Sequence, residues 1–391
     1  MSGNRNPILE RSSQVNMDAE ASGWLGVRIC RKFCWPSRGE ILPGVEGSPR
    51  NQPRPRGLTV AVTGPTGDIG RALMGALDRS KRVKKVRGMA RRKFDPAERG
   101  WTKVEYTQGD VLDRDSVEEL VTGADVVVHL AFLIFGSHTE TREVNLRGSR
   151  NVFEAAVKAR AKRLVYTSSV AAYGFEPGRP HELTEDIEPQ GTHSFYYSAQ
   201  KAELEEAFKS AVAGADIDGF VFRPCIVAGA DAPTLVGELT RNLALGARIP
   251  PVRALIRAVP GLEPMLPDTG LPFQLVHHDD VAAAVLAAVL GEGKPGTYNL
   301  AAEGEVTMGD LARELGWIRV PVPGLAVSGA AELISRVPLM PAQLEWIHAV
   351  RVPSLMKTDR ARRELGWEPE HDALQTLRET VAGARGEGAV D

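Results

Sequence analysis

Two side chains that could transfer a proton together, the phenol of Tyr197 and the ammonium of Lys201, are spaced four residues apart. Residues at this spacing lie on the same face of a helix. A free phenol titrates near pH 10, and lowering its pKa to about 7 takes roughly 4 kcal/mol of preferential stabilisation of the phenolate. The Lys201 ammonium can supply it, whereas Tyr196 has only the uncharged Gln200 at the same offset. The pair predicts acid–base chemistry by Tyr197, with a nicotinamide cofactor moving the hydride.

A glycine-rich turn at residues 63–70 precedes this pair and could bind such a cofactor. The turn follows a strand-like run, residues 58–63, and opens a predicted helix at about residue 68. Its three glycines can provide a tight turn, a close approach of backbone to pyrophosphate and packing of helix on strand, with the helix N-terminus facing the anion. We therefore predict dinucleotide binding by Gly64, Thr66, Gly67, Asp68, Ile69 and Gly70.

Short β-branched runs alternate with helical segments from residue 58 onward, which indicates βαβ crossovers and a parallel sheet covered on both faces. The expected strands are residues 58–63, 83–90, 103–107, 124–131, 163–168 and 219–223, and the expected long helices are residues 139–160 and 194–211. The fold class is therefore α/β, a doubly wound parallel sheet of Rossmann type. We assign residues 57–225 to this domain, with 273–301 returning to it, and residues 226–272 and 302–391 to a smaller, interwoven substrate-binding domain.

The composition excludes several classes of partner. The chain has 391 residues, a formal net charge of −2, 25% charged and 43% hydrophobic residues, so bulk electrostatics favour neither nucleic acid nor a membrane. Neither a signal peptide nor a membrane span is evident. Three cysteines cannot form a framework of disulfides, and we expect a cytoplasmic protein. Residues 1–56 lack helix or strand periodicity, and we expect a disordered leader there.

The chain resembles the extended short-chain dehydrogenase/reductases, the NAD-dependent epimerase/dehydratase family, over about residues 57–380. The motifs that carry the resemblance occur in order: the turn at 63–70, Gly109-Asp110-Val111, His129-Leu130-Ala131, residues 145–152, residues 166–174, Tyr197 with Lys201, Arg223-Pro224, residues 276–281, Tyr298-Asn299-Leu300 and residues 364–369. This series is very specific for the family and poorly specific for a substrate.

The resemblance also implies roles for individual residues. Asp110, beside Val111, would bond the adenine amino group of the cofactor. Leu130 and Ala131 would line the cofactor channel, and Lys201 would bond the nicotinamide ribose. The Ser169 hydroxyl would bond the substrate oxygen, while Ser168 would make backbone and cofactor contacts. Asn145 would kink its helix by binding backbone and would hold a proton-relay water; the alternative is a tolerated defect. Relatives often pair as homodimers through the two long helices, and we expect a homodimer.

The end of the second strand bears on the choice of cofactor. NAD-preferring relatives usually carry a carboxylate there, whereas this chain has Ala90 followed by Arg91 and Arg92. An arginine can bind a 2′-phosphate bidentately, so we favour NADP over NAD. The alternative is that both arginines continue a solvated basic run. No recognition motif accompanies that run, so we predict no nucleic-acid partner.

Two further features bear on metal and substrate. His277-His278-Asp279-Asp280 could suggest a metal site, but strand residues alternate between faces and Asp280 is placed to cap the next helix, so we predict a structural join and no metal. Val170-Ala171 replaces the acid–base pair of sugar dehydratases, and neither Cys225-Ile226 nor Phe273-Gln274 could neutralise a diphosphate. The apolar stretch 244–271 suggests an apolar substrate wall, a lid or a contact surface.

These observations predict an NAD(P)-dependent oxidoreductase acting on a secondary alcohol or ketone of a moderately apolar small molecule. A nucleotide-sugar epimerase, using the same Tyr197 and Lys201 for transient oxidation, is the first alternative. A cofactor-binding regulatory protein without catalysis is the second, and the presence of Ser169, Tyr197 and Lys201 argues against it.

Overall fold

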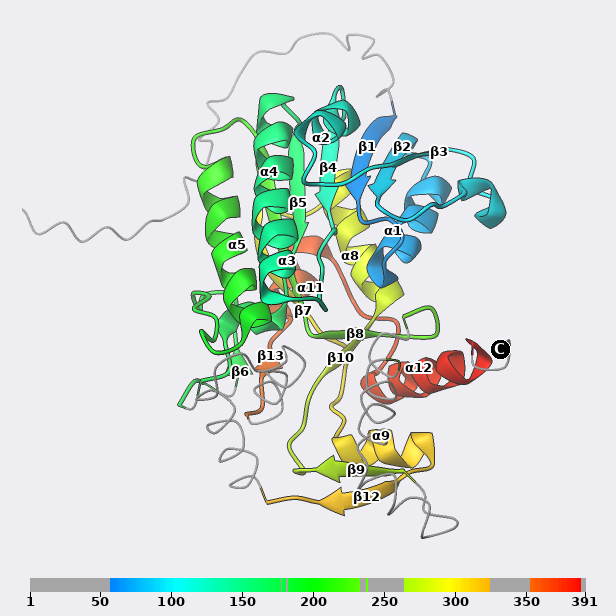
Figure 1. Cartoon of the computed structure of the whole chain (residues 1–391), viewed down its shortest axis with the longest axis vertical. Coiled ribbons are helices and arrows are strands. Elements are labelled where there is room, and N and C mark those ends of the chain that lie inside the picture. The colour runs from blue at the N-terminus through cyan, green and yellow to red at the C-terminus, as the bar shows by residue number, and fades with distance from the viewer. Residues whose placement is uncertain are drawn as a thin grey trace, which may run out of the picture. The chain divides into compact units, whose positions relative to one another are not determined.

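Seven parallel strands form the central sheet, in the order β11-β7-β5-β4-β1-β2-β3 (Figure 1). The computed structural model describes residues 57–176, 178–180, 182–232, 237, 264–323 and 352–387. The strands are β1 (Leu58–Thr63), β2 (Val83–Ala90), β3 (Val104–Gln108), β4 (Val126–His129), β5 (Arg163–Thr167), β7 (Asp218–Pro224) and β11 (Gly296–Leu300). The doubly wound fold is thereby confirmed. The strand order reverses between β1 and β4, where such sheets bind ligands.

Helices cover both faces of the sheet, as Figure 1 shows. The helices α1 (Asp68–Arg79), α8 (His278–Leu290) and α11 (Asp359–Leu365) share a core with one face, and α2 (Arg114–Val121), α4 (Gly148–Lys158) and α5 (Tyr196–Val212) share a core with the other. The alternation of side chains along β1 fixes this arrangement, because Val60 and Val62 enter the first core while Ala61 enters the second. Both faces of a central parallel strand must be apolar, which explains its continuous apolar sequence.

The long helix expected at residues 139–160 has three consecutive parts. It begins as α3 (His138–Arg142), continues as the π-helical turn η2 (Glu143–Arg147) and ends as α4. Asn145 lies in the middle of the π-helical turn, and its side chain is fully buried. Wider turns of this kind often occur at functional sites.

Short elements from distant parts of the chain surround the carboxyl ends of the strands. Three small parallel pairs are β8 (Ile226–Ala228) with β10 (Leu275–His277), β9 (Met265–Asp268) with β12 (Ile318–Pro321), and β6 (Glu182–Leu183) with β13 (Leu355–Met356). A third core joins β8, β9 and β10 to α9 (Met308–Leu315) and α12 (Ala373–Glu387), whereas Leu183 of β6 and Met356 of β13 belong to the first core. Two 3-10 turns, η1 (Pro96–Arg99) and η3 (Val170–Tyr173), complete the described elements.

Two of the sequence predictions concern segments that the structure does not describe. The expected leader, residues 1–56, lies outside the described residues, and so does most of the apolar stretch 244–271, of which only 264–271 is described. The division into a dinucleotide-binding and a substrate-binding domain stays a prediction, although β11 lies at the edge of the main sheet beside β7.

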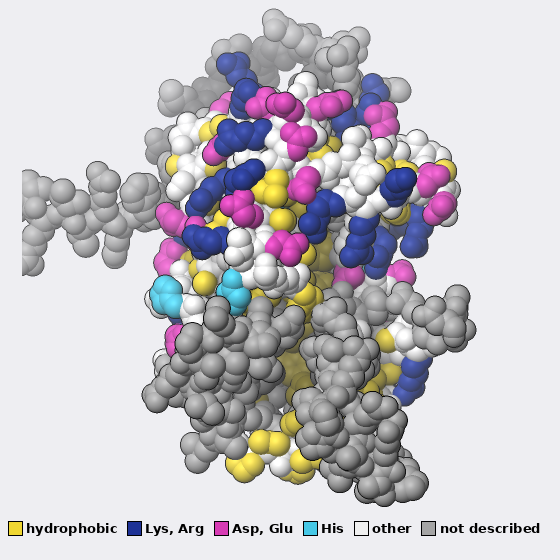
Figure 2. All heavy atoms as spheres, in the orientation of Figure 1, with side chains coloured by type: hydrophobic (Ala, Val, Ile, Leu, Met, Phe, Trp, Pro, Cys, Tyr) yellow, Lys and Arg dark blue, Asp and Glu magenta, His cyan; other side chains and the backbone are white. Residues whose placement is uncertain are grey.

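Charges of both signs alternate over the face of α2 and α4 (Figure 2). Ion pairs such as Arg114–Glu154 at 2.9 Å and Lys158–Glu118 at 2.8 Å balance them locally. Surface pairs of this kind contribute little stability, but they leave no extended field of one sign on this face. Among the described helices, none combines the length and the apolar character needed to cross a bilayer.

Candidate active site

Tyr197 and Ser169 meet at the carboxyl end of β5. Ser169 caps η3, where its hydroxyl accepts a hydrogen bond from the Ala171 amide at 3.2 Å. Tyr197 lies in the first turn of α5, and its hydrogen bond with Ser169 lowers the pKa of the phenol. Desolvation outweighs this bond, so the pKa of Tyr197 is raised above its ordinary value. The two hydroxyls that sequence analysis assigned to one site are therefore side by side.

The Lys201 ammonium is enclosed beside this pair. The side chain is 3% exposed, its Nζ donates to the Thr167 carbonyl at 3.0 Å, and the same atom lies 3.9 Å above the centre of the Phe132 ring. No carboxylate among the described residues bonds it. Desolvation lowers the pKa of Lys201 to about 7, although the nearby Glu205 raises it in part.

These values correct one expectation. We predicted that Lys201 would lower the pKa of Tyr197, but burial acts on both groups and favours the neutral form of each. Tyr197 is therefore an acid in this structure, a phenol that can donate a proton, while Lys201 titrates near neutral pH.

Asn145 connects the π-helical turn to the loop after β4 and to α5. Its Oδ1 accepts from the Leu133 amide at 2.7 Å, and its Nδ2 donates to the Leu133 carbonyl at 3.0 Å and to Gln200 Oε1 at 2.8 Å. Every polar atom of this buried amide thus has a partner, which excludes the reading of a tolerated defect. The proton-relay water stays a prediction.

The three glycines of the turn each meet a different steric demand. Gly64 has φ +75°, and a Cβ there would lie 2.7 Å from the Ala131 amide. At Gly70 a Cβ would lie 2.2 Å from the Gly64 carbonyl oxygen, so this glycine lets α1 pack against the turn. A Cβ at Gly67 would meet only the Gly64 oxygen, at 3.6 Å. The turn is closed on the protein side and open at Gly67, as a pyrophosphate cradle requires.

The remaining predicted cofactor residues lie along the same edge of the sheet. Leu130 and Ala131 follow β4, and the Leu130 amide donates to the Thr63 carbonyl at 3.1 Å. Asp110 accepts from the Leu112 amide at 3.0 Å through one carboxylate oxygen, and Val111 beside it is 7% exposed. The structure therefore brings residues from the ends of β1, β3 and β4 to one edge.

A buried hydroxyl at this edge is unpaired. Thr167 Oγ1, at the end of β5, has no hydrogen-bond partner among the described residues and is shielded from solvent. Leaving a buried hydroxyl without a partner costs free energy, so a polar ligand in the site would satisfy it. Together with the open face at Gly67, this atom fits a bound dinucleotide.

Comparison with known proteins decides the family. The profile of the NAD dependent epimerase/dehydratase family matches residues 60–301. The sterol demethylase protein B of Methylococcus capsulatus is 30% identical over 339 residues, which cover 80% of this chain and 94% of that protein. The chain belongs to this family. An uncharacterized protein of Sinorhizobium fredii is 28% identical over 334 residues, 82% of this chain and 77% of that protein.

Solved structures with the same fold have been determined with NAD. A short-chain dehydrogenase/reductase superfamily protein from Agrobacterium tumefaciens with bound NAD has a TM-score of 0.63 at 21% identity, covering 85% of this chain and 98% of that one. The UDP-glucuronic acid 4-epimerase from Bacillus cereus in complex with NAD has a TM-score of 0.62 at 15% identity, covering 84% and 99%. At these identities the likeness shows the fold alone.

In this family member, the guanidinium groups of Arg91 and Arg92 are exposed and form no ion pair with the described residues. The backbone that carries them is held by side chains of β3, because Gln108 donates to the Arg91 carbonyl at 2.8 Å and the Tyr106 hydroxyl donates to the Ala90 carbonyl at 2.9 Å. Two free cations on a fixed strand end are compatible with a 2′-phosphate.

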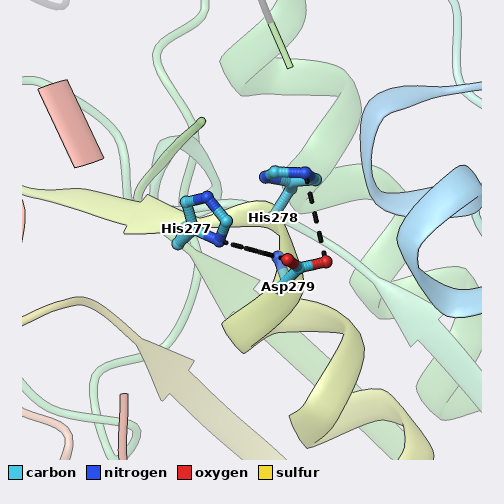
Figure 3. Close-up of side chains that lie close together, drawn as sticks. All are labelled: His277, His278 and Asp279. Carbon is cyan, nitrogen blue, oxygen red and sulfur yellow. Dashed lines mark hydrogen bonds and ion pairs between the residues drawn. The ribbon is translucent and has the colours of Figure 1, made fainter. Parts of the chain in front are cut away.

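The histidine pair at the junction of β10 and α8 is drawn in Figure 3. The helix begins at His278, and its N-cap is His277, whose Nδ1 accepts from the Asp279 amide at 3.3 Å. The prediction that Asp280 caps this helix is wrong. Asp280 lies within the first turn and accepts instead from the amides of Glu370 at 2.9 Å and His371 at 3.2 Å, since the C-terminal segment packs over it.

Ligand atoms of two groups in this cluster lie within 4.8 Å of one another: His277, His278 and Asp279, and His277, His371 and Glu379. The rings of His277 and His371 are stacked, with centroids 3.8 Å apart and planes at 22°. Rings stacked nearly parallel do not direct their lone pairs at a common ion, and Nδ1 of His371 bonds Asp280 at 3.1 Å. These contacts count against an ion bound by His277, His371 and Glu379, and the structural join without metal remains a prediction.

Sequence reasoning missed Glu205 and its hydrogen bond with Ser168. The Ser168 hydroxyl, which we assigned to backbone and cofactor contacts, donates to Glu205 Oε1 at 2.6 Å. Glu205 is in turn paired with Arg223, and both are buried. The signal was available, because Glu205 follows Lys201 by four residues and so lies on the same side of α5.

Proposed function

We propose that this protein is an NAD(P)-dependent oxidoreductase that interconverts a secondary alcohol and a ketone on a moderately apolar small molecule. The observation that carries the proposal is the contact between Ser169 and Tyr197 beside the enclosed Lys201, on the sheet edge that also carries the phosphate turn. Acid–base groups at the carboxyl ends of parallel strands, next to a dinucleotide cradle, are what hydride transfer to a carbonyl needs.

The residues divide the proton chemistry between them. In the reductive direction, Tyr197 donates its hydroxyl proton to the ketone oxygen, and Ser169 donates a hydrogen bond to the same oxygen as negative charge develops on it. The cofactor, when bound, supplies the hydride that reaches the carbonyl carbon, and the product is the secondary alcohol. Lys201 holds positive charge beside Tyr197 and so stabilises the phenolate that remains. The oxidative direction reverses each step.

Several features support an apolar substrate rather than a nucleotide sugar. The Phe132 ring packs edge-on against Tyr197, with centroids 5.5 Å apart. Cys225 is buried, and the Gln274 amide is occupied by the backbone of Met356, with bonds of 3.3 and 2.7 Å, so neither can hold a diphosphate. The match with the relative named sterol demethylase protein B covers 94% of that protein. We therefore propose a sterol-like alcohol or ketone as the first substrate to test.

A nucleotide-sugar epimerase is the alternative, favoured by the fold shared with the UDP-glucuronic acid 4-epimerase. One experiment separates the two. Purified protein is mixed with NAD or NADP and a panel of hydroxysterols and ketosterols, and in parallel with nucleotide sugars, while absorbance at 340 nm and product mass are followed. Net absorbance change with a sterol supports the proposal. Isomerised sugar without net absorbance change would establish the epimerase instead.

Cofactor choice and assembly are also proposals. We propose that NADP binds more tightly than NAD, supported by Arg91 and Arg92, which form no ion pair within the described part of the chain, although the structural relatives named above hold NAD. Calorimetric titration with each dinucleotide tests this directly. A homodimer that pairs through α4 and α5 and a cytoplasmic location remain predictions, testable by light scattering and by fractionation.

A further inference from the structure

Glu205 and Arg223 form a buried ion pair one helical turn beyond Lys201. Each side chain is about 1% exposed, Arg223 Nε donates to Glu205 Oε1 at 2.9 Å, and an Arg223 terminal nitrogen donates to Oε2 at 2.6 Å. The Arg223 guanidinium also stacks over the Tyr173 ring, 4.4 Å from its centre. A bidentate pair of this kind has fixed geometry, so its carboxylate can position other groups.

Besides the bonds from Arg223, the Glu205 carboxylate accepts a hydrogen bond from the Ser168 hydroxyl at 2.6 Å. Ser168 lies between Thr167 and Ser169, the two residues at the end of β5 that contact Lys201 and Tyr197. On one side, the Thr167 carbonyl accepts from Lys201 at 3.0 Å, and on the other, the Ser169 hydroxyl bonds Tyr197. Glu205 therefore accepts a side-chain hydrogen bond from the residue between these two contacts, whose backbone amide also donates to the Phe222 carbonyl at 2.7 Å.

Glu205 also supplies negative charge to the Lys201 ammonium, which bonds no carboxylate among the residues that the structure describes. The rings around Lys201 are neutral at neutral pH, since burial raises the pKa values of the tyrosines and lowers that of the histidine to about 3. The titratable groups facing Lys201 are His129 from β4, Tyr166 from β5, and Tyr197 and Glu205 from α5, with Arg223 from β7 behind Glu205. Glu205 is the anion in this set, and its field raises the pKa of Lys201.

We propose that Glu205 is a positioning residue for the catalytic pair: it helps to hold the 167–169 backbone through Ser168 and supplies negative charge that favours the cationic form of Lys201. The catalytic meaning of this role rests on the proposed function, but the role itself is measurable without substrate or cofactor. Removing Glu205 alone would leave the buried charge of Arg223 without its carboxylate partner, which is strongly destabilising. The informative variant is therefore the double substitution Glu205→Gln with Arg223→Met, which removes both charges together.

The test is a pH titration of the Lys201 side chain in the full-length protein, followed by NMR of 13Cε-labelled lysine and assigned with Lys201→Met. We expect the double variant to lower the midpoint by about one pH unit. Glu206→Gln, an exposed neighbour on the same helix, serves as the matched control and should leave the midpoint unchanged. An unchanged midpoint in the folded double variant would overturn the electrostatic part, whatever reaction the protein catalyses.

A second variant tests the positioning part and does not depend on the double variant folding. Ser168→Ala keeps the ion pair but removes the hydrogen bond to the strand end, so kcat should fall about tenfold or more while cofactor affinity stays unchanged. Ser168→Thr, which keeps the hydroxyl, should restore activity. Full turnover in Ser168→Ala would overturn the positioning role. If neither variant nor wild type turns over any substrate while the Lys201 midpoint shifts as expected, the proposed function fails and the electrostatic role of Glu205 stands.

Discussion

Replacing Gly67 by alanine should weaken dinucleotide binding and leave the fold intact. Gly67 has φ −81° and ψ 175°, which alanine adopts readily, and its Cβ would meet only the Gly64 oxygen at 3.6 Å. At an N-cap, alanine is worse than glycine by up to about 1 kcal/mol, which a smaller loss of chain entropy on folding offsets in part. The methyl group would stand on the open side of the turn, where pyrophosphate must approach. We expect affinity to fall about tenfold or more, equivalent to roughly 1.4 kcal/mol.

Gly70→Ala provides the contrast, because its Cβ would lie 2.2 Å from the Gly64 oxygen and 2.8 Å from the Pro65 carbonyl carbon. These are backbone atoms that cannot rotate away, so we expect a loss of about 2–3 kcal/mol in the free energy of unfolding. Denaturant unfolding measures stability, and calorimetric titration with NAD and NADP measures binding. Wild-type affinity in Gly67→Ala would refute the assignment of this turn as a phosphate cradle, and wild-type stability in Gly70→Ala would refute the tight packing of α1 on the turn.

Three further predictions concern the chemistry, and one concerns the contact between Asp280 and the C-terminal segment. Tyr197→Phe should lower kcat by about 10²–10⁴-fold with cofactor affinity unchanged, measured by steady-state kinetics and titration; retained turnover would exclude the phenol as the acid. Because the pKa of Lys201 is lowered to about 7, the ammonium is lost as pH rises through that value, and kcat/KM should fall there; a profile flat to pH 9 would contradict this. Replacing Arg91 and Arg92 by serine should weaken NADP binding about tenfold and spare NAD, as calorimetry would show; an equal loss for both would count against 2′-phosphate recognition. Asp280→Asn should lower the free energy of unfolding by about 1–3 kcal/mol, because the carboxylate bonds two backbone amides, and an unchanged denaturation midpoint would contradict the join.

Local patterns were sufficient to predict the main sheet. The strand at Leu58–Thr63 and the helix starting at Asp68 were expected at the observed positions, because period-two and period-3.6 patterns and a glycine turn are properties of short segments. The small pairs β6–β13 and β8–β10 were not predicted. Each strand of these pairs has only two or three residues, and the strand that it pairs with lies far away in the sequence, so no local pattern predicts the pairing.

The candidate site shows the same division. The motifs placed Ser169 and Tyr197 together, since both lie at the ends of elements whose order was evident. The direction of the pKa shift of Tyr197 was wrong because it depends on desolvation, a property of the packed interior. Likewise, Asp280 suited a helix cap by position, but its partners come from a segment 90 residues later. The pKa of Tyr197 and the partners of Asp280 thus depend on contacts between distant segments, which local sequence patterns do not predict.

Residues 359–387 contribute to the first and third cores, with Ala361, Leu365 and Trp367 in the first and α12 in the third. During synthesis, the sheet can form from earlier segments, but α8 lacks its contacts with Ala361, Leu365 and Trp367 until this stretch leaves the ribosome. The nascent chain therefore exposes apolar surface until residues 359–387 have been made, which is later than the site residues. A stalled chain lacking this stretch should be a substrate for chaperones rather than a smaller working enzyme.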